Sequence, residues 1–251
     1  MSDRVIIARE GGVLSGTLNQ PDKKNAIDSA MIDGLYALLE RAELDAEARV
    51  VAVRGAGKDF CAGMDLHELL ASADRTVEQN RDAALHFGGV FLRMRALPKP
   101  VVAVVQGRAL AGGCGLATAC DLVLAAESAQ FGYPEVQRGF VPALVMNMLR
   151  RAVGEKVAFD LAMGRLLAAR EAEVKGLVSR VFPDDAFADG VAGVLRALCG
   201  ISAGSLALTK QQFYRLDGTS FEEGVRLSAN VNAVSRTTPD FRSAIAAFLK
   251  Q

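Results

Sequence analysis

The stretch VVAVVQGRALAGGCGLATACD, residues 101–121, decides the fold. Its first five residues form a continuous apolar run, which is typical of a strand buried on both faces of a parallel sheet. The strand ends at Gly107, and Ala111-Gly112-Gly113 then opens a short helix that reaches Cys120. Residues 121–126 read as the next strand. A buried strand, a small-residue loop, a helix and another strand are typical of an α/β fold.

The same pattern occurs upstream. Residues 50–53 predict a buried strand that ends at Gly55, and the loop GAGKDFCAGMD follows over residues 55–65. Both loops thus leave the carboxyl ends of strands, where ligands bind in open α/β sheets, and we expect them to lie side by side. The Gly112 amide should be a free first-turn donor supported by the helix dipole. Two such donors on one oxygen atom form an oxyanion hole, worth ~3 kcal/mol of barrier per donor.

The rest of the chain extends this α/β pattern. Residues 5–8 and 13–18 predict an antiparallel hairpin, because Gly11-Gly12 between them suits a tight turn. Amphipathic helices are expected up to about Leu44, with Asp28 or Ser29 as the cap, and over residues 77–95.

Helical patterns dominate after residue 141. The exceptions are the connecting loops and one strand-like piece at residues 176–181. The last helix is expected over residues 241–249. We therefore expect an α/β core over residues 1–195 and a helical C-terminal region over residues 196–251.

Composition limits the possible functions. Hydrophobic residues make up 51% of the 251, which favours a compact core over disorder. Lys plus Arg and Asp plus Glu both total 29, so the zero net charge disfavours nucleic acid as a partner. No leader and no apolar run near the ~18 residues that span a bilayer are present, so we expect a cytoplasmic protein without a membrane partner. Four cysteines without a C-x-x-C pair, and only two histidines, predict no metal site.

Common nucleotide and hydrolase motifs do not fit. Gly55-Ala56-Gly57 follows a strand, but Phe60 stands where a dinucleotide-binding motif has its third glycine, and a loop follows instead of a helix. Neither a phosphate-loop G-x-x-x-x-G-K-[ST] nor a G-x-S-x-G elbow occurs in the sequence.

Three segments in order resemble signatures of the enoyl-CoA hydratase/isomerase (crotonase) superfamily: FCAGMDL at 60–66, residues 107–121, and QFGYPE at 130–135. NQPDKKNA at 19–26 resembles its N-terminal motif, and the similarity runs from about residue 5 to the end. The resemblance implies a spiral of ββα turns with C-terminal trimerisation helices. It also implies an acyl-coenzyme A substrate, as in fatty acid metabolism, with no separate cofactor, and a homotrimer or a dimer of trimers (homohexamer).

The same resemblance implies site residues. It assigns the two oxyanion amides to Ala62 and Gly112. Positions that contact the substrate or coenzyme A in relatives match Lys23, Lys24, Ala62, Gly63, Met64, Asp65, Leu66, Gly112, Gly113, Pro134 and, from a neighbouring subunit, Phe248 and Lys250.

The resemblance leaves one carboxylate for acid-base chemistry. Hydratases of simple 2-enoyl thioesters carry two glutamates, of which the second matches Glu135 and the first falls on Gly115. Glu135 is then the sole acid and base. An apolar pocket would raise its pKa from ~4.3 toward neutrality, and we expect that pocket to contain Phe131, Tyr133, Phe140 and Val141.

Several reactions fit one carboxylate beside an oxyanion hole. Hydration is the first choice, because GCGLA at 113–117 and the PEVxxGxxPA pattern from Pro134 resemble hydratases of the methylglutaconyl-CoA type. Double-bond isomerisation and decarboxylation need the same oxyanion hole and remain alternatives. An alternative of another class is a non-catalytic coenzyme A-binding or scaffold protein, since some members of the superfamily have binding roles such as RNA contact.

Other chemically capable side chains are expected to be structural or solvated. We predict that His67 and His86 are solvated and that Cys114 and Cys120 are buried packing residues. Asp65 and Asp121 are expected to cap elements, and Arg138 to lie at the surface.

Overall fold

The computed structural model describes residues 4–250 and contains a six-stranded sheet ordered β1-β2-β3-β4-β6-β9. The first two strands pair antiparallel, as the hairpin prediction requires, and all later neighbours pair parallel. The strands are β1 (Val5–Glu10), β2 (Val13–Leu18), β3 (Val50–Gly55), β4 (Val101–Val105), β6 (Leu122–Ala126) and β9 (Arg180–Phe182). The strand expected at residues 176–181 is wrong in its bounds, because a turn and a bend follow the end of α7 over residues 175–177 and the strand begins only at Arg180.

A second sheet was not expected from the sequence. It holds three strands of three residues each, with β5 parallel to β7 and β7 antiparallel to β8. They are β5 (Arg108–Leu110), β7 (Gln130–Gly132) and β8 (Leu166–Ala168). This sheet carries the chain from β4 to the start of α4, and from β6 to the segment that holds Glu135.

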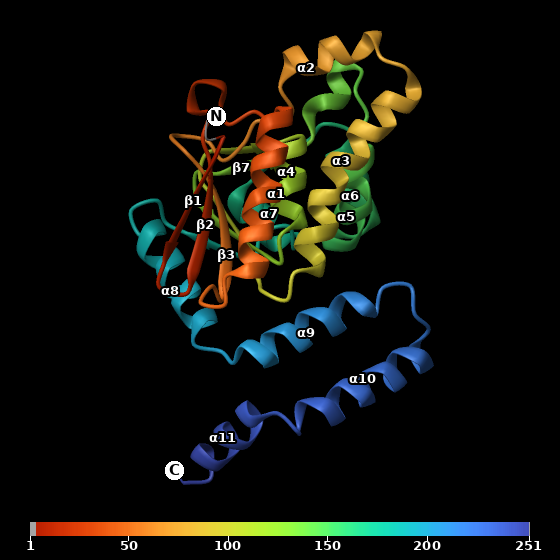
Figure 1. The fold of residues 1–251 in the computed structure, drawn as a ribbon. Helices are drawn as coiled ribbons and strands as arrows, with labels where there is room; N and C mark the ends of the chain where they lie inside the picture. Colours follow the sequence, from red (N-terminus) through yellow and green to blue (C-terminus); the bar gives the residue numbers. More distant parts are fainter. Residues whose placement is uncertain (1–3, 251) are drawn as a thin grey trace.

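The central strands of the large sheet, β3, β4 and β6, are buried on both faces. Alternate residues of β3 point to opposite sides, so that Val51 and Val53 join the main core while Val50 and Ala52 pack on α8. The main core also takes side chains from α1, α3, α4, α5, α6 and α7. Figure 1 shows helices such as α1, α3 and α5 gathered on one side of the strands. The helices of residues 4–199 are α1 (Ser29–Leu44), α2 (Leu66–Ala71), α3 (Val77–Ala96), α4 (Gly112–Ala119), α5 (Ala143–Val153), α6 (Glu155–Ala162), α7 (Ala169–Val174) and α8 (Phe187–Cys199), with short 3-10 turns η1 (Pro21–Lys23), η2 (Ser72–Asp74) and η3 (Pro134–Arg138).

The last three helices leave the sheet. They are α9 (Ala203–Arg215), α10 (Phe221–Ser235) and α11 (Pro239–Phe248), and Figure 1 shows α10 and α11 below the rest of the molecule. Only α9 is fastened to the core by a buried ion pair. Lys210 Nζ lies 2.7 Å from Asp121 Oδ2 and donates to the carbonyls of Met94 and Lys99, at 2.7 and 2.9 Å. Asp121 is therefore structural, as predicted, although it binds a remote helix instead of only capping an element.

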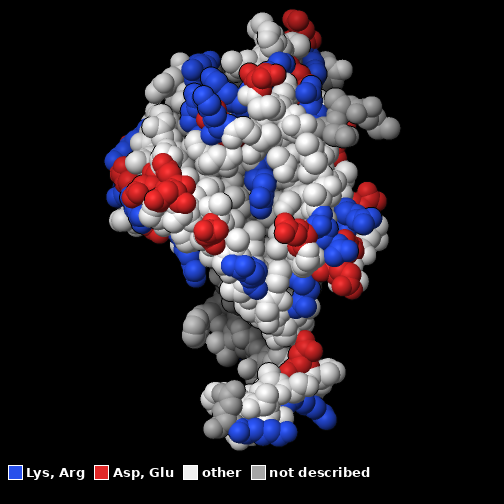
Figure 2. All heavy atoms as spheres, turned by 90° about the vertical axis from the view of Figure 1, so that its left-hand side faces the viewer, with Lys and Arg blue, Asp and Glu red and all other residues white. Residues whose placement is uncertain are grey.

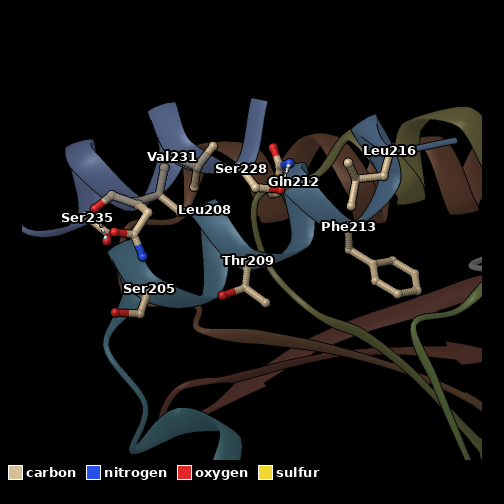
Figure 3. A pocket seen from close by; sticks show the side chains of 10 residues that line it. Ser205, Leu208, Thr209, Gln212, Phe213, Leu216, Ser228, Val231 and Ser235 are labelled. Carbon is tan, nitrogen blue, oxygen red and sulfur yellow. Dashed lines mark hydrogen bonds between the residues drawn. The ribbon is translucent and has the colours of Figure 1, made fainter. Parts of the chain in front are cut away.

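A groove of about 490 Å³ separates α9 from α10. Its lining mixes apolar and polar side chains, and Figure 3 shows Leu208, Leu216 and Val231 beside Gln212 and Ser228. Gln212 Nε2 donates to Ser228 Oγ at 3.0 Å, which links the two helices. The groove therefore belongs wholly to the C-terminal region.

Candidate active site

The loop after β3 is organised by Asn25. This side chain is fully buried, and its backbone has a φ of 53° in the left-handed region, which asparagine tolerates. Its Nδ2 donates to the carbonyls of Ala56 and Asp59, at 2.9 and 2.8 Å, and its Oδ1 accepts from the Gln20 amide at 2.9 Å. The NQPDKKNA segment therefore fixes the shape of the loop.

The structure contradicts the assignment of Ala62 as a free oxyanion donor. Its amide donates to the Lys24 carbonyl at 3.0 Å. A backbone N–H that already has a buried acceptor cannot bind a ligand oxygen without losing that bond. Ala62 therefore joins the loop to the NQPDKKNA segment and does not present a donor.

The amide two residues later is available instead. The Ile27 amide donates to Gly63 O and the Asp65 amide donates to Ile27 O, both at 2.8 Å, which makes a short parallel bridge centred on Met64. Because the bridge uses the flanking groups, the N–H of Met64 faces the other way. Within residues 4–250 it has no protein acceptor.

The second donor lies at the start of α4, as predicted. Gly112 is the first residue of the helix, and within the described chain its amide donates to no protein acceptor. The residue before it, Ala111, has φ 50° and ψ −127°, a conformation that favours glycine. The carbonyl of Ala111 accepts from the Gly115 amide at 2.9 Å and so begins the helical hydrogen bonding.

The two loops lie side by side, as expected. Leu110 donates to Cys61 O at 2.9 Å. A Cβ added to Gly63 would lie only 2.8 Å from the Ala111 methyl group and 3.3 Å from the Gly112 nitrogen. The backbones can approach this closely only because Gly63 has no side chain, and its φ of 101° also favours glycine.

The amides of Met64 and Gly112 are therefore neighbours. The position of a Cβ on Gly112 lies 3.6 Å from Met64 Cγ. Two adjacent amides without protein acceptors can donate to one oxygen atom, and the positive end of the α4 dipole favours charge on that oxygen. This pair replaces the predicted pair of Ala62 and Gly112.

Glu135 lies in η3, directly after β7. Its Oε2 is buried, and among residues 4–250 it finds no hydrogen-bond partner. Burial raises the pKa of this carboxyl above its ordinary value. The group is thus held partly out of water in a place where it can give and take a proton.

Tyr133 places Glu135 against α4. The Tyr133 side chain is fully buried, and its hydroxyl lies 2.9 Å from Thr118 Oγ1, which in turn donates to the carbonyl of Cys114 at 2.7 Å. Burial raises the pKa of the Cys114 thiol to about 12, and the nearby Glu135 carboxylate adds to this rise. Glu135 therefore lies close to the first turn of α4.

The predicted pocket around Glu135 is only half right. Phe131 and Tyr133 are fully buried, but Phe140 and Val141 are 49% and 60% exposed. The latter two follow the left-handed turn at Gly139 and lie at the surface. Of the four residues predicted to form the pocket, only Phe131 and Tyr133 are therefore buried.

Gly115, as the sequence indicated, offers no carboxylate. It is buried in α4, and a Cβ built on it would overlap Cγ1 of Val145 in α5. Val145 is only 4% exposed. The sequence alone gave no sign of this contact.

The predicted coenzyme A residues fall into two groups. Lys23 and Lys24 are exposed near the loop, and Lys23 Nζ lies 2.8 Å from Asp65 Oδ2. The Lys23 ammonium holds the pKa of the Asp65 carboxyl below its usual value, and Asp65 caps α2 as predicted. Leu66 is exposed, whereas Gly113 is buried against Cys61 and Pro134 begins η3.

Phe248 and Lys250 do not lie near the loops of their own chain. Both are exposed at the end of α11, and Figure 1 shows α11 at the opposite end of the molecule from α2. Contact with a substrate from these positions would have to be made across a subunit boundary, which is how they were predicted to act.

The remaining candidates behave as structural or surface residues. His67, His86 and Arg138 are exposed, and His86 Nε2 lies 3.2 Å from Asp33 Oδ1. Cys114 and Cys120 are buried with raised pKa values, which suits packing. Residues 4–250 hold no group of three His, Cys, Asp or Glu side chains that could bind a metal.

The distribution of charge and of long apolar helices also bears on partner surfaces. On the face shown in Figure 2, basic and acidic side chains are interspersed. No single helix within the described residues has the length and apolar character needed to cross a membrane, although α8 and α9 together, bent by 98°, meet both criteria.

Two backbone amides without acceptors among residues 4–250, and a carboxylate whose Oε2 is buried, are typical of α/β enzymes that bind a carbonyl oxygen. Comparison with known proteins identifies the family. The family model described as enoyl-CoA hydratase/isomerase matches residues 8–251. The chain therefore belongs to the enoyl-CoA hydratase/isomerase family, within the crotonase superfamily, and is an enzyme with enoyl-CoA hydratase or related isomerase activity.

Individual relatives agree over nearly the whole chain. A Thermus thermophilus protein named "Putative enoyl-CoA hydratase" is 40% identical over 248 residues, 98% of both chains. The 2,3-dehydroadipyl-CoA hydratase of Escherichia coli is 32% identical over 98% of this chain and 96% of its own. The crystal structure of an enoyl-CoA hydratase from Mycobacterium smegmatis superposes with a TM-score of 0.94 at 31% identity, covering 98% of this chain and 96% of that one.

Proposed function

We propose that the protein hydrates a 2-enoyl-CoA thioester. The amides of Met64 and Gly112 bind the thioester carbonyl oxygen, and Glu135 is the sole acid and base. The observation that carries this proposal is the buried, unpartnered Oε2 of Glu135 beside the first turn of the helix that begins with Gly112. A buried carboxylate oxygen without a partner is costly unless a ligand or water completes it.

In the proposed reaction Glu135 first accepts a proton and then donates it, while the two amides bind the thioester oxygen. Glu135 takes a proton from water while the water oxygen bonds to the β-carbon, and the double-bond electrons move onto the thioester oxygen. The two amides stabilise that enolate oxygen, which carries the charge. Glu135 then returns the proton to the α-carbon, and the net change is the addition of one water molecule.

Two other reactions could use the same groups. Isomerisation needs one base that moves a proton between the carbons flanking the enolate, and decarboxylation needs the oxyanion hole and one proton donor. Hydration is favoured because three of the similar proteins carry the name hydratase. For the acyl group we propose a short or dicarboxylic enoyl chain of the methylglutaconyl kind, with coenzyme A as part of the substrate and no separate cofactor.

Product analysis tests the proposal. Purified protein is incubated with crotonyl-, 3-hexenoyl- and 3-methylglutaconyl-CoA, and products are identified by mass spectrometry. Hydration adds water to at least one 2-enoyl thioester. An isomer of unchanged mass, or loss of carbon dioxide, would replace hydration by one of the alternatives. If thioesters bind but none reacts or exchanges an α-proton with deuterium oxide, the protein is a non-catalytic binder.

We also propose that the active protein is a trimer, or a dimer of trimers, of this chain. The C-terminal helices expose large apolar side chains, with Phe213, Phe221 and Phe248 at 70%, 91% and 72% exposure, and Phe213 also lines the groove between α9 and α10. In such an assembly Phe248 and Lys250 of one subunit, with Lys23 and Lys24 of another, can bind coenzyme A. Light scattering should give the mass of three or six chains, and Phe221→Glu should lower it. A monomeric parent protein would contradict this proposal.

A further inference from the structure

We infer that Gly115 and Val145 act as a pair that sets the number of acid-base groups in the site. Val145 fills, from α5, the space that a side chain on Gly115 would need. The chemistry is thereby confined to Glu135. This inference rests on the proposed function, because it concerns how the same site handles protons.

The contact is tight. A Cβ on Gly115 would overlap Val145 Cγ1 and lie 3.3 Å from Val145 Cβ, and Phe91 Cζ is 4.0 Å away. Even alanine at position 115 therefore requires the Val145 side chain, or α5 itself, to shift. Movement of α5 is opposed by its own packing, since Leu149 on the same helix is fully buried in the main core.

The blocked space lies on the reacting side of α4. Gly115 comes three residues after Gly112, so both face the same side of the helix. Side chains on a helix lean toward its N-terminus, and one on Gly115 would lean toward the Gly112 amide. The hydroxyl of Tyr133, two residues before Glu135, lies 2.9 Å from Thr118 Oγ1 of α4, so the segment that holds Glu135 packs on this helix. A carboxylate on position 115 would therefore lie near both the bound oxygen and Glu135.

In place of a carboxylate, this side of the site has an apolar wall. Val145 and Phe91 border Gly115, and Phe87 lies 3.6 Å from the position of a Cβ on Gly112. Phe87 and Phe91 pack edge to face with centroids 4.7 Å apart. Water at the β-carbon can thus be held by Glu135 but not by a second charged group. We expect a single ionisation to control the rate on the acid limb of the pH profile.

The pair predicts that two substitutions are needed to add a second carboxylate. Gly115→Glu combined with Val145→Ala provides the group and the space, and Gly115→Gln with Val145→Ala is its uncharged control. Gly115→Glu alone and Val145→Ala alone complete the set. Measurements are hydration turnover, α-proton exchange with deuterium oxide, and the pH profile from pH 4 to 9.

The Glu/Ala double variant should hydrate about tenfold or more faster than the Gln/Ala control and show a second ionisation in its pH profile. Gly115→Glu alone should gain no activity and melt at a lower temperature. The inference is overturned if the two double variants behave alike, or if Gly115→Glu alone gains as much as the double variant.

A second route covers a double variant that fails to fold. Val145→Asp brings a carboxylate into the same space from α5, with Val145→Asn as its control, and the same second ionisation is expected. Its absence would equally overturn the inference. If the parent protein reacts with no thioester, the proposed function fails, whereas an active parent with indifferent variants contradicts only the role of Gly115 and Val145.

Discussion

The two sides of the site are built in different ways. The proposed oxygen-binding side consists of backbone amides, held in place by backbone hydrogen bonds to and from Ile27 and by the side chain of Asn25. The proposed acid-base side consists of one side chain, Glu135, whose Oε2 has no hydrogen-bond partner within the described part of the chain. The first side depends on the exact path of the chain, and the second on what surrounds a single carboxylate.

This difference separates the effects of substitution. A change at Glu135 removes a reacting group but leaves the backbone in place. A change in the loops moves or deletes a donor and disturbs the packing of two segments at once. Activity and stability should therefore respond differently on the two sides.

The largest effect is expected on the acid-base side. Glu135→Gln keeps the size of the side chain but cannot exchange a proton, so turnover should fall about 1000-fold. Affinity for a thioester and the unfolding temperature should change little. Steady-state kinetics and calorimetric binding measure both. A variant that retains activity within a few-fold of the parent would show that Glu135 is not the acid-base group.

The oxygen-binding side is tested next. Met64→Pro deletes an N–H that has no acceptor among residues 4–250, so it removes the proposed donor to the ligand without breaking a hydrogen bond within that part of the chain. We expect turnover to fall about 100-fold. Met64→Leu keeps the amide and a similar volume and should remain close to the parent. Equal turnover in the proline and leucine variants would show that the Met64 amide is not a donor.

A smaller effect is expected one step further from the ligand. Asn25→Asp keeps the acceptor for Gln20 but replaces the donor to Ala56 and Asp59 by a second oxygen. Facing carbonyls with a carboxylate should lower stability by about 2 kcal/mol and turnover about tenfold. Asp22→Asn, an exchange at an exposed position in the same segment, is the control. Denaturant unfolding and kinetics would contradict the role of Asn25 if the two variants behaved alike.

Features that depend on neighbouring residues could be predicted from the sequence, whereas features that depend on contacts between distant segments could not. The strands β3 and β4 were predictable, because both are buried on both faces and contain the unbroken apolar runs at residues 50–53 and 101–105. β5, β7 and β8 were not, because three residues are too few to show a period. Gly112 was predictable as a donor, since the start of a helix leaves its first amides unpaired.

The choice between Ala62 and Met64 could not be made locally. Which of the two amides is free is decided by Lys24 and Ile27, some forty positions earlier in the chain. The same holds for Val145, whose contact with Gly115 depends on how α5 packs on α4. Motif resemblance assigned the donor to Ala62, whose amide is bonded to Lys24, whereas the amide without an acceptor among the described residues is that of Met64, two residues later.

The smallest expected effect is the pH dependence of stability. Burial raises the pKa of Glu135 in the folded protein above its value in the unfolded chain. Below the ordinary carboxyl pKa both states are protonated, and the group costs nothing. As the pH rises through the interval between the ordinary and the raised pKa, the unfolded state loses its proton first and is favoured, so folding loses stability.

Glu135→Gln has no such proton to lose. Its unfolding free energy, relative to the parent, should therefore increase from pH 4 to pH 8 in paired denaturant titrations. A constant difference, or one of opposite sign, would mean that Glu135 is solvated in the free protein. It would then contradict the raised pKa on which the proposed acid-base role of Glu135 depends.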